Sequence, residues 1–288
     1  MPGGQLKRLR SRFSAPRQRR RFHCQERMLR SLWEYRFFVL TSIWNDFYMR
    51  FVRSKLGGAW LILHPLSQVM IYAFILSNLL ASRIPGISGS YGYAIYLMAG
   101  LLGWNLFSEV LDRCMKVFVK NANIIKKMSF PRITLPIIEI GSALLNNMVL
   151  LAVMVVIFFL LGHGIDWSIL TVFLLAPVVA LLAAGIGITL GVLNVFIRDV
   201  EQVMPIILQL MFWFTPIVYP AGAIPEQYLQ YLRLSPIFQI VSAYHEAIVF
   251  HRFPPLAPIA ILFVLALFAC ALAIFMFRRA NADMVDVL

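Results

Sequence analysis

Charged residues and cysteine are both scarce in this chain of 288 residues. Only 14% of its residues are charged and 60% are hydrophobic, whereas soluble domains average about 25% charged residues. The three cysteines, Cys24, Cys114 and Cys270, lie far apart without CxxC or CxxH spacing, so neither a zinc site nor a disulfide framework is supported. This composition, with a mean hydropathy of +0.78, favours a membrane protein.

Motifs that carry chemistry are missing as well. The sequence has no GxxxxGK[ST] loop that could hold nucleotide phosphates. Gly185, Gly187 and Gly191 lie inside an apolar run without a nearby Lys or Arg, where small residues let helices approach closely. The histidines are scattered, and the carboxylates do not cluster as a glycosyl- or phosphotransferase acting on a lipid-linked sugar would need. We therefore expect no catalytic residue, no metal site and no cofactor bound by this chain.

The formal net charge of +13 is distributed in a way that argues against a nucleic-acid partner. Most Lys and Arg residues precede Leu56 or flank apolar runs, which is typical of membrane orientation and of attraction to anionic lipid. Residues 1–30 are predicted to form a basic cytoplasmic tail. Across residues 31–56, aromatic and apolar side chains recur every three or four positions, which predicts an amphipathic helix in the membrane interface.

Residues 57–288 are predicted to form an all-α transmembrane domain with six spans, because a helix that crosses the bilayer needs about 20 mainly apolar residues. Lys and Arg concentrate before the first span, between the second and third, and after the last. We therefore expect a multi-pass membrane protein with both termini in the cytoplasm. The predicted spans are residues 59–81, 93–117, 133–161, 169–196, 200–219 and 256–277.

The stretch 220–255 is too polar and too rich in proline to be a seventh span. Proline is tolerated in the first turn of a helix, so two short helices are expected there, at the outer membrane surface. Irregular backbone at membrane depth must be buried in protein or line a wet cavity, which makes this stretch a candidate gate or exit collar. The residues expected to form the gate are Pro220, Pro225, Tyr228, Pro236 and Tyr244.

Several short motifs occur in a characteristic order. The run RFVRSKLGGAW at residues 50–60 leads into the first span. It is followed by FPR at 130–132, LP at 135–136, RD at 198–199, TPI at 215–217 and YP at 219–220. Together these motifs resemble the type-2 ABC membrane subunits of polysaccharide exporters, and most of all the O-antigen exporter permeases. Permeases for capsule and for teichoic acid are close relatives of that group.

The resemblance implies a homodimer of six-helix subunits that encloses a pore in the bacterial inner membrane. It also implies that the two short helices before the last span form a periplasmic gate. Two copies of a separate ATPase subunit would bind ATP and Mg²⁺ and meet two cytoplasmic coupling helices. Ordinary positively charged loops are the alternative explanation for the basic positions. The residues expected to couple to the ATPase are Asn123, Lys126, Lys127, Arg198, Asp199 and Glu201.

Basic and aromatic residues around the start of the first span have two expected roles, which the sequence leaves open. They anchor to lipid phosphate, or they contact the ATPase or the pyrophosphate of a lipid-linked substrate. They are Trp44, Arg50, Arg53, Lys55 and Trp60.

A second group is expected to include rings that line the channel, because sugar rings have apolar faces that stack on aromatic side chains. Rings facing lipid are the alternative. The group is Tyr72, Tyr96, Trp104, Phe107, Phe212, Trp213, Phe214 and Tyr219.

Polar positions inside the spans complete the set. Asn105, Asn146, Asn147 and Gln209 either bind sugar hydroxyls or join helices. Glu109 with Arg113 and Asp112 with Lys116 are spaced to pair along one helix.

The function predicted from the sequence is a permease subunit, not an enzyme, that moves lipid-linked polysaccharide from cytoplasm to periplasm. Export of capsule polymer, teichoic acid or a small drug-like molecule by the same architecture is the alternative.

Overall fold

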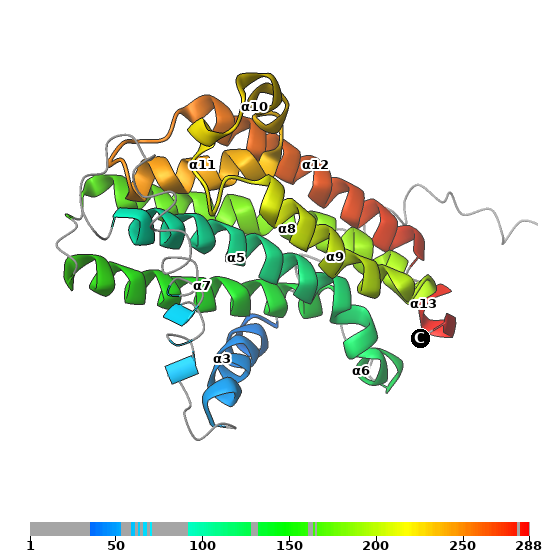
Figure 1. Cartoon of the computed structure of the whole chain (residues 1–288). Coiled ribbons are helices and arrows are strands. Elements are labelled where there is room, and N and C mark those ends of the chain that lie inside the picture. The colour runs from blue at the N-terminus through cyan, green and yellow to red at the C-terminus, as the bar shows by residue number, and fades with distance from the viewer. Residues whose placement is uncertain are drawn as a thin grey trace, which may run out of the picture.

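Four long helices run side by side in the computed structural model of the chain (Figure 1). All four are long and apolar enough to cross a membrane, and their bounds agree closely with the second, third, fourth and sixth predicted spans. They are α5 (Gly92–Lys120), α7 (Thr134–Leu160), α8 (Leu170–Phe196) and α12 (Leu256–Ala280).

The structure describes residues 35–52, 59, 60, 63, 66, 67, 70, 92–127, 132–160, 164, 166–280 and 283–287. Every element within these residues is helical. The predicted tail (1–30) and most of the predicted first span (59–81) lie outside the described residues, so they stay predictions.

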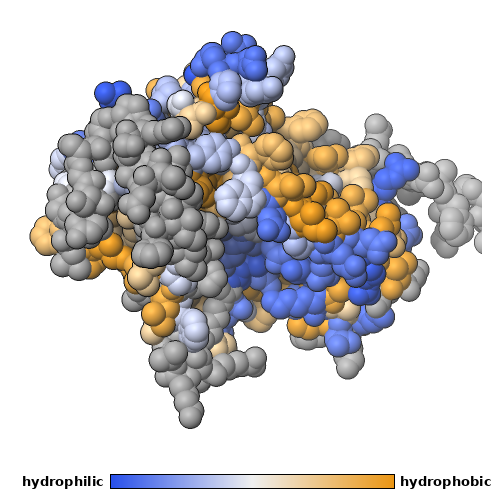
Figure 2. Space-filling view, viewed as in Figure 1, coloured by the Kyte–Doolittle hydropathy of each residue, from blue (hydrophilic) through white to orange (hydrophobic). Residues whose placement is uncertain are grey.

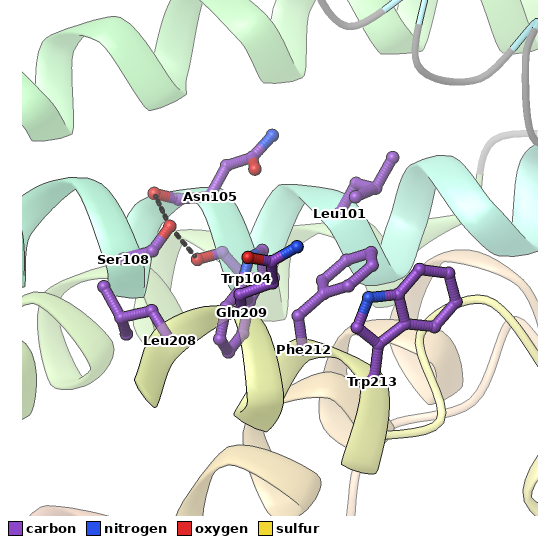
Figure 3. A pocket seen from close by; sticks show the side chains of 8 residues that line it. All are labelled: Leu101, Trp104, Asn105, Ser108, Leu208, Gln209, Phe212 and Trp213. Atoms are coloured by element: carbon purple, nitrogen blue, oxygen red, sulfur yellow. Dashed lines mark hydrogen bonds between the residues drawn. The ribbon is translucent and has the colours of Figure 1, made fainter. Parts of the chain in front are cut away.

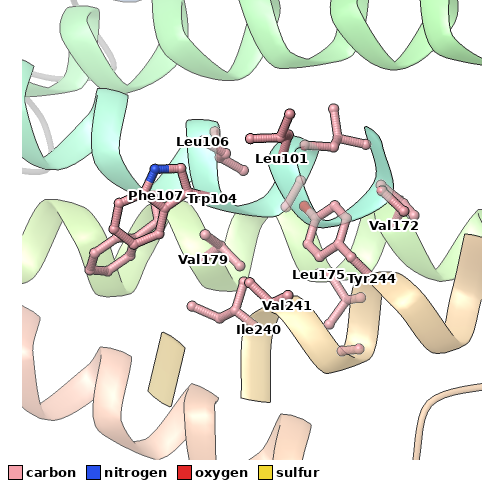
Figure 4. Packing of buried hydrophobic residues seen from close by; sticks show 14 of the residues in the cluster. Leu101, Trp104, Leu106, Phe107, Val172, Leu175, Val179, Ile240, Val241 and Tyr244 are labelled. Carbon is pink, nitrogen blue, oxygen red and sulfur yellow. The ribbon is translucent and has the colours of Figure 1, made fainter. Parts of the chain in front are cut away.

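Helix α8 lies at the centre of the bundle, between α5 and α12. Its glycines make that position possible. A Cβ atom on Gly185 would lie 2.6 Å from the backbone carbonyl carbon of Ala269 in α12, and one on Gly191 would lie 2.7 Å from the carbonyl oxygen of Cys114 in α5. Both distances are too short for a side chain, which confirms that these glycines serve close helix packing. Figure 4 shows the buried side chains of α5, α8 and α11 that meet around this centre.

Helix α9 (Asp199–Phe214) is shorter than the predicted fifth span, which extended to residue 219. Its 16 residues give a length of about 24 Å, somewhat less than the roughly 30 Å of a bilayer core. The helix ends because Thr215 precedes Pro216 and therefore avoids the α conformation; its φ and ψ are −90° and 139°. The apolar residues that follow form a turn, so the prediction is wrong at that end.

The region 220–255 contains the two short helices that the sequence predicts. They are α10 (Glu226–Leu232) and α11 (Pro236–Ile248), preceded by a short 3-10 turn, η3 (Ala221–Ala223). Pro236 occupies the first turn of α11. Helix α11 lies on α5, which it contacts over much of its length.

Helix α3 (Arg36–Val52) crosses α7 as an amphipathic helix (Figure 1). Phe37, Leu40 and Trp44 are exposed on its outer side. Ile43 faces α7 and occupies the space where Gly141 lacks a side chain. A helix is thus confirmed at residues 36–52, and its position in the membrane interface stays a prediction.

A small apolar cluster joins the ends of several helices near Lys120. It brings together α6 (Ala122–Lys127) and α13 (Asp283–Val287) through Ile125 and Met284. Phe118 of α5 stacks on Phe277 of α12 in the same cluster, with 5.5 Å between ring centroids. This cluster ties both short helices to the bundle.

Candidate functional site

A groove between α5 and α9 gathers the polar and aromatic side chains that the sequence singles out (Figure 3). It has a volume of about 270 Å³. The α5 residues lie three, four and seven positions after Leu101, and the α9 residues lie one, four and five positions after Leu208. Side chains at these spacings share one face of a helix, so each wall comes from one helix face. The lining residues are Leu101, Trp104, Asn105 and Ser108 from α5, and Leu208, Gln209, Phe212 and Trp213 from α9.

Aromatic rings form one part of the groove. The rings of Trp104 and Phe212 lie 5.6 Å apart across the two helices at an interplanar angle of 58°. Phe212 in turn meets Trp213 edge to face at 5.5 Å. Trp104 is nearly buried, whereas Trp213 is half exposed. The pairs prefer such tilted geometries because of their ring quadrupoles, so the aromatic wall is preformed and presents the Trp213 ring to the groove.

The polar side chains of the groove differ in whether they have partners. Ser108 Oγ donates to the carbonyl oxygen of Trp104 at 2.9 Å. Among the described residues, the side-chain amides of Asn105 and Gln209 have no hydrogen-bond partner. None of the described residues that line the groove is charged. The arrangement can therefore bind a ligand that is rich in hydroxyl groups, has apolar ring faces and needs no counter-charge.

Tyr96 and Tyr93 hold the turn after α9 against α5. Tyr93 donates to the carbonyl oxygen of Val218 at 2.8 Å, and Tyr96 donates to that of Pro216 at 3.2 Å. The Tyr96 ring also stacks on His245 of α11, with centroids 3.8 Å apart. The structure thus places Tyr96 in a joint between α5, the turn and α11, a few residues from the groove.

Two glycines of α5 receive α11. A Cβ atom on Gly100 would lie 2.8 Å from His245 Nε2, and one on Gly103 would lie 2.8 Å from the ring of Tyr244. His245 Nε2 donates to the carbonyl oxygen of Tyr96 at 3.0 Å. Burial lowers the pKa of His245 to about 3, although this hydrogen bond acts in the opposite direction. The imidazole is therefore neutral at physiological pH. Tyr244 is fully buried and serves as a core side chain.

A network of charged side chains joins α3, α5 and α7 below the groove. Arg113 contacts Glu109 at 2.6 Å, Glu139 at 3.2 Å and Asp46 at 3.3 Å. Lys120 reaches Glu139 from the other side at 2.9 Å. The predicted Glu109–Arg113 pair is confirmed, but its partners on α3 and α7 were not predicted.

The predicted pair of Lys116 with Asp112, 2.6 Å apart, is also confirmed. Figure 2 shows a hydrophilic surface over the end of α5.

The two amides of α7 face α5. Asn146 donates to Glu109 at 2.9 Å, and Asn147 donates to the carbonyl oxygen of Leu102 at 3.1 Å. Both therefore join helices, which is one of the two roles that the sequence left open for them.

The predicted coupling residues lie at one end of the bundle. Asn123 and Lys126 are exposed on α6, and Lys127 ends that helix. Arg198 and Asp199 are exposed in the turn between α8 and α9. Glu201 is held in place by the buried Asn194, which donates to it at 3.4 Å.

The remaining predicted residues are dispersed. Trp44 and Trp60 are exposed and Phe107 is buried in the core. Phe214 lies on the other side of α9, facing α10 and α11 across a mainly apolar hollow of about 160 Å³. Pro220 is buried, Tyr219 is partly buried, and Pro225 and Tyr228 are exposed. The side chain of Arg50, and the whole of Arg53, Lys55 and Tyr72, lie outside the described residues.

Sequence reasoning missed Gly100, Gly103 and His245. The presence of two glycines one turn apart inside a span was the available signal, since small residues are enriched at contacts between transmembrane helices. Within the described residues, no three His, Cys, Asp or Glu side chains converge so as to hold a metal ion.

Comparison with known proteins gives one consistent result. The family described as ABC-2 type transporter matches residues 39–249. An O-antigen export system permease protein RfbA of Klebsiella pneumoniae is 31% identical over 217 residues, covering 74% of this chain and 80% of the relative. The RfbA protein of Myxococcus xanthus is 26% identical over 88% of this chain and 96% of its own length. The polysialic acid transport protein KpsM of Escherichia coli is 25% identical over 69% and 76%.

Proposed function

This chain belongs to the ABC-2 type transporter family, and we propose that it is the membrane permease of an exporter of lipid-linked, O-antigen-type polysaccharide. The groove between α5 and α9 is the observation that carries this proposal. Among the described residues, it offers aromatic rings and two unpaired amides and no charged side chain. Sugars present hydroxyls and apolar ring faces, so a long hydrated glycan can slide along such a surface without a deep binding site.

The chain supplies the conduit, and a separate ATPase subunit supplies the energy. We propose a homodimer in the inner membrane that binds two ATPase copies at α6 and at the turn between α8 and α9. Both termini then lie in the cytoplasm. The exposed charges of Lys126, Arg198 and Asp199 support this placement, because charged rims set the register of a docked partner.

Deletion of the chain in its host tests the proposal. We expect full-length lipid-linked glycan to accumulate on the cytoplasmic face of the inner membrane, and the wild-type chain supplied in trans to restore surface glycan. The measurement is selective labelling of glycans on each membrane face. An unchanged distribution, in a strain without a second copy of the transporter, would contradict the proposal. Loss of glycan from both faces would indicate a role in synthesis.

One observation favours a second candidate, the export of a small lipophilic molecule. The hollow beside Phe214 is lined mainly by apolar residues of α9, α10 and α11. Paired variants separate the two functions. Gln209→Leu should impair only a glycan exporter, whereas Phe238→Asn should impair only an exporter of lipophiles.

A further inference from the structure

A second hollow lies where α11 meets α5 and the turn after α9. It has a volume of about 190 Å³. Ser242, His245 and Glu246 of α11 line it together with Tyr96 of α5 and Phe250. The three α11 residues are spaced at i, i+3 and i+4, so they share one face of the helix. Polar and aromatic side chains are thus concentrated in a second place, outside the groove described above.

One wall of this hollow is rigid. His245 donates to the backbone of α5, its ring stacks on Tyr96, and Tyr96 in turn donates to Pro216. These contacts fix the position of both rings. The wall is therefore preformed, which lowers the entropic cost of ligand binding.

The other polar side chains of the hollow are free. Neither the hydroxyl of Ser242 nor the carboxylate of Glu246 has a hydrogen-bond or ion-pair partner among the described residues. By contrast, Glu226 on α10 pairs with Arg233 at 3.6 Å. Partly buried carboxylates usually have a donor to bind. A ligand with several hydroxyl groups would supply such donors, and a carboxylate can accept from two of them.

The hollow follows the groove along the same elements. Tyr96 lies eight residues before Trp104 on α5, a separation of about 12 Å along the helix axis. On the other side, Pro216 and Pro220 line the hollow just after α9 ends at Phe214. A chain that passes Trp213 in the groove would next meet this hollow.

We propose that the hollow is a second saccharide subsite, and that it takes an uncharged, hydroxyl-bearing sugar of the exported polymer. Glu246 and Ser242 bind the hydroxyls, and Phe250 offers an apolar surface. The single carboxylate repels anionic polymers, so the subsite selects for neutral glycan. This inference rests on the proposed function, whose substrate class it narrows.

Photo-crosslinking in cells tests the inference. A benzophenone amino acid placed at Gly222 would reach the hollow, which Gly222 also lines, and a Cβ atom there meets no atom within 4 Å. The control position is Tyr231, which is exposed on α10. On irradiation we expect the host's own glycan to become attached at position 222 and not at 231. Released and analysed, the captured glycan should be neutral.

Two matched variants then examine Glu246. In the position-222 background, Glu246→Gln should lower the adduct yield roughly tenfold, since one charge-assisted hydrogen bond is lost. Glu226→Gln, which removes a paired and exposed charge, should leave the yield unchanged. Ser242→Ala gives a second, smaller reduction if Glu246→Gln does not insert.

Three results would overturn the inference: no adduct at position 222 in cells that display glycan through this protein, an adduct of acidic glycan, or equal yields with Glu246→Gln. The proposed function fails separately, if the wild-type chain does not restore surface glycan to the deletion strain.

Discussion

Single residues in the α5–α9 groove determine what it can hold. Asn105 and Gln209 were predicted from the sequence as polar positions inside spans, and the structure brings both to the same groove with Trp104. A buried amide without a partner is costly, whereas an amide that faces a wet groove can exchange water for sugar hydroxyls. The sequence could not decide between these roles, because it does not show which face of each helix is covered.

Gln209 should matter for export. We expect Gln209→Leu to slow polymer export about three- to tenfold, since one neutral hydrogen bond contributes roughly 0.5–1.5 kcal/mol. Gln227→Leu on α10, also exposed, is the control and should export normally. The measurement is the rate at which surface glycan reappears after induction. Equal rates for the two variants would remove Gln209 from the path.

His245 should make the protein sensitive to acid. Its folded-state pKa of about 3 lies below the ordinary value of about 6.5, so the unfolded chain binds a proton between these pH values and the folded chain does not. Stability is therefore fully present above pH 6.5 and falls with decreasing pH, by up to about 1.4 kcal/mol per pH unit. Melting temperatures of the purified protein between pH 7.5 and 5 measure this loss.

The control for that measurement is His245→Gln, which can still donate to the carbonyl oxygen of Tyr96. Its melting temperature should be lower at pH 7.5 but should depend less on pH. A parallel decline in the variant and the wild type would show that other groups cause the acid sensitivity.

At the scale of elements, hydropathy predicted the long helices well and their contacts poorly. The segments that become α5, α7, α8 and α12 are each longer than 20 residues and mainly apolar, so their ends were found within a few positions. The end of α9 was missed, because the apolar residues after Pro216 continue the hydropathy of a span although the backbone turns. The contact of α11 with α5 joins residues 149 positions apart, and periodicity carries no information on such pairs.

The network around Arg113 shows what such contacts contribute. Arg113 is 13% exposed and faces carboxylates from α3, α5 and α7. We expect Arg113→Met to destabilise the protein by about 3–5 kcal/mol, because the nearly buried Glu139 and the partly buried Glu109 lose their shared cation. Lys116→Met, which breaks a half-exposed pair on the same helix, should cost no more than about 1 kcal/mol. Denaturant unfolding in detergent compares the two variants, and similar losses would refute the bridging role of Arg113.

For the whole molecule, the proposed function assigns the input of energy from a partner ATPase to the charged end of the bundle. Helix α6 and the turn between α8 and α9 are both anchored to the bundle, by the apolar cluster around Ile125 and Met284 and by the Asn194–Glu201 hydrogen bond. A push on either element can therefore move the long helices as units. The order of motifs in the sequence predicted these two elements, but not the role of α13 in holding them.

The double variant Arg198→Ala, Asp199→Ala tests coupling across the molecule. Both side chains are exposed. Their removal should therefore leave membrane insertion and the melting temperature as in the wild type. Docking of the ATPase should weaken, since charged rims set register and association rate, and export should fall at least tenfold. Gln202→Ala, one turn further on the exposed side of α9, is the control.

Copurification of the ATPase separates the two explanations: loss of export with the ATPase still bound indicates failed transmission, and loss of both indicates failed docking. Normal export by the double variant would exclude this turn from the coupling surface.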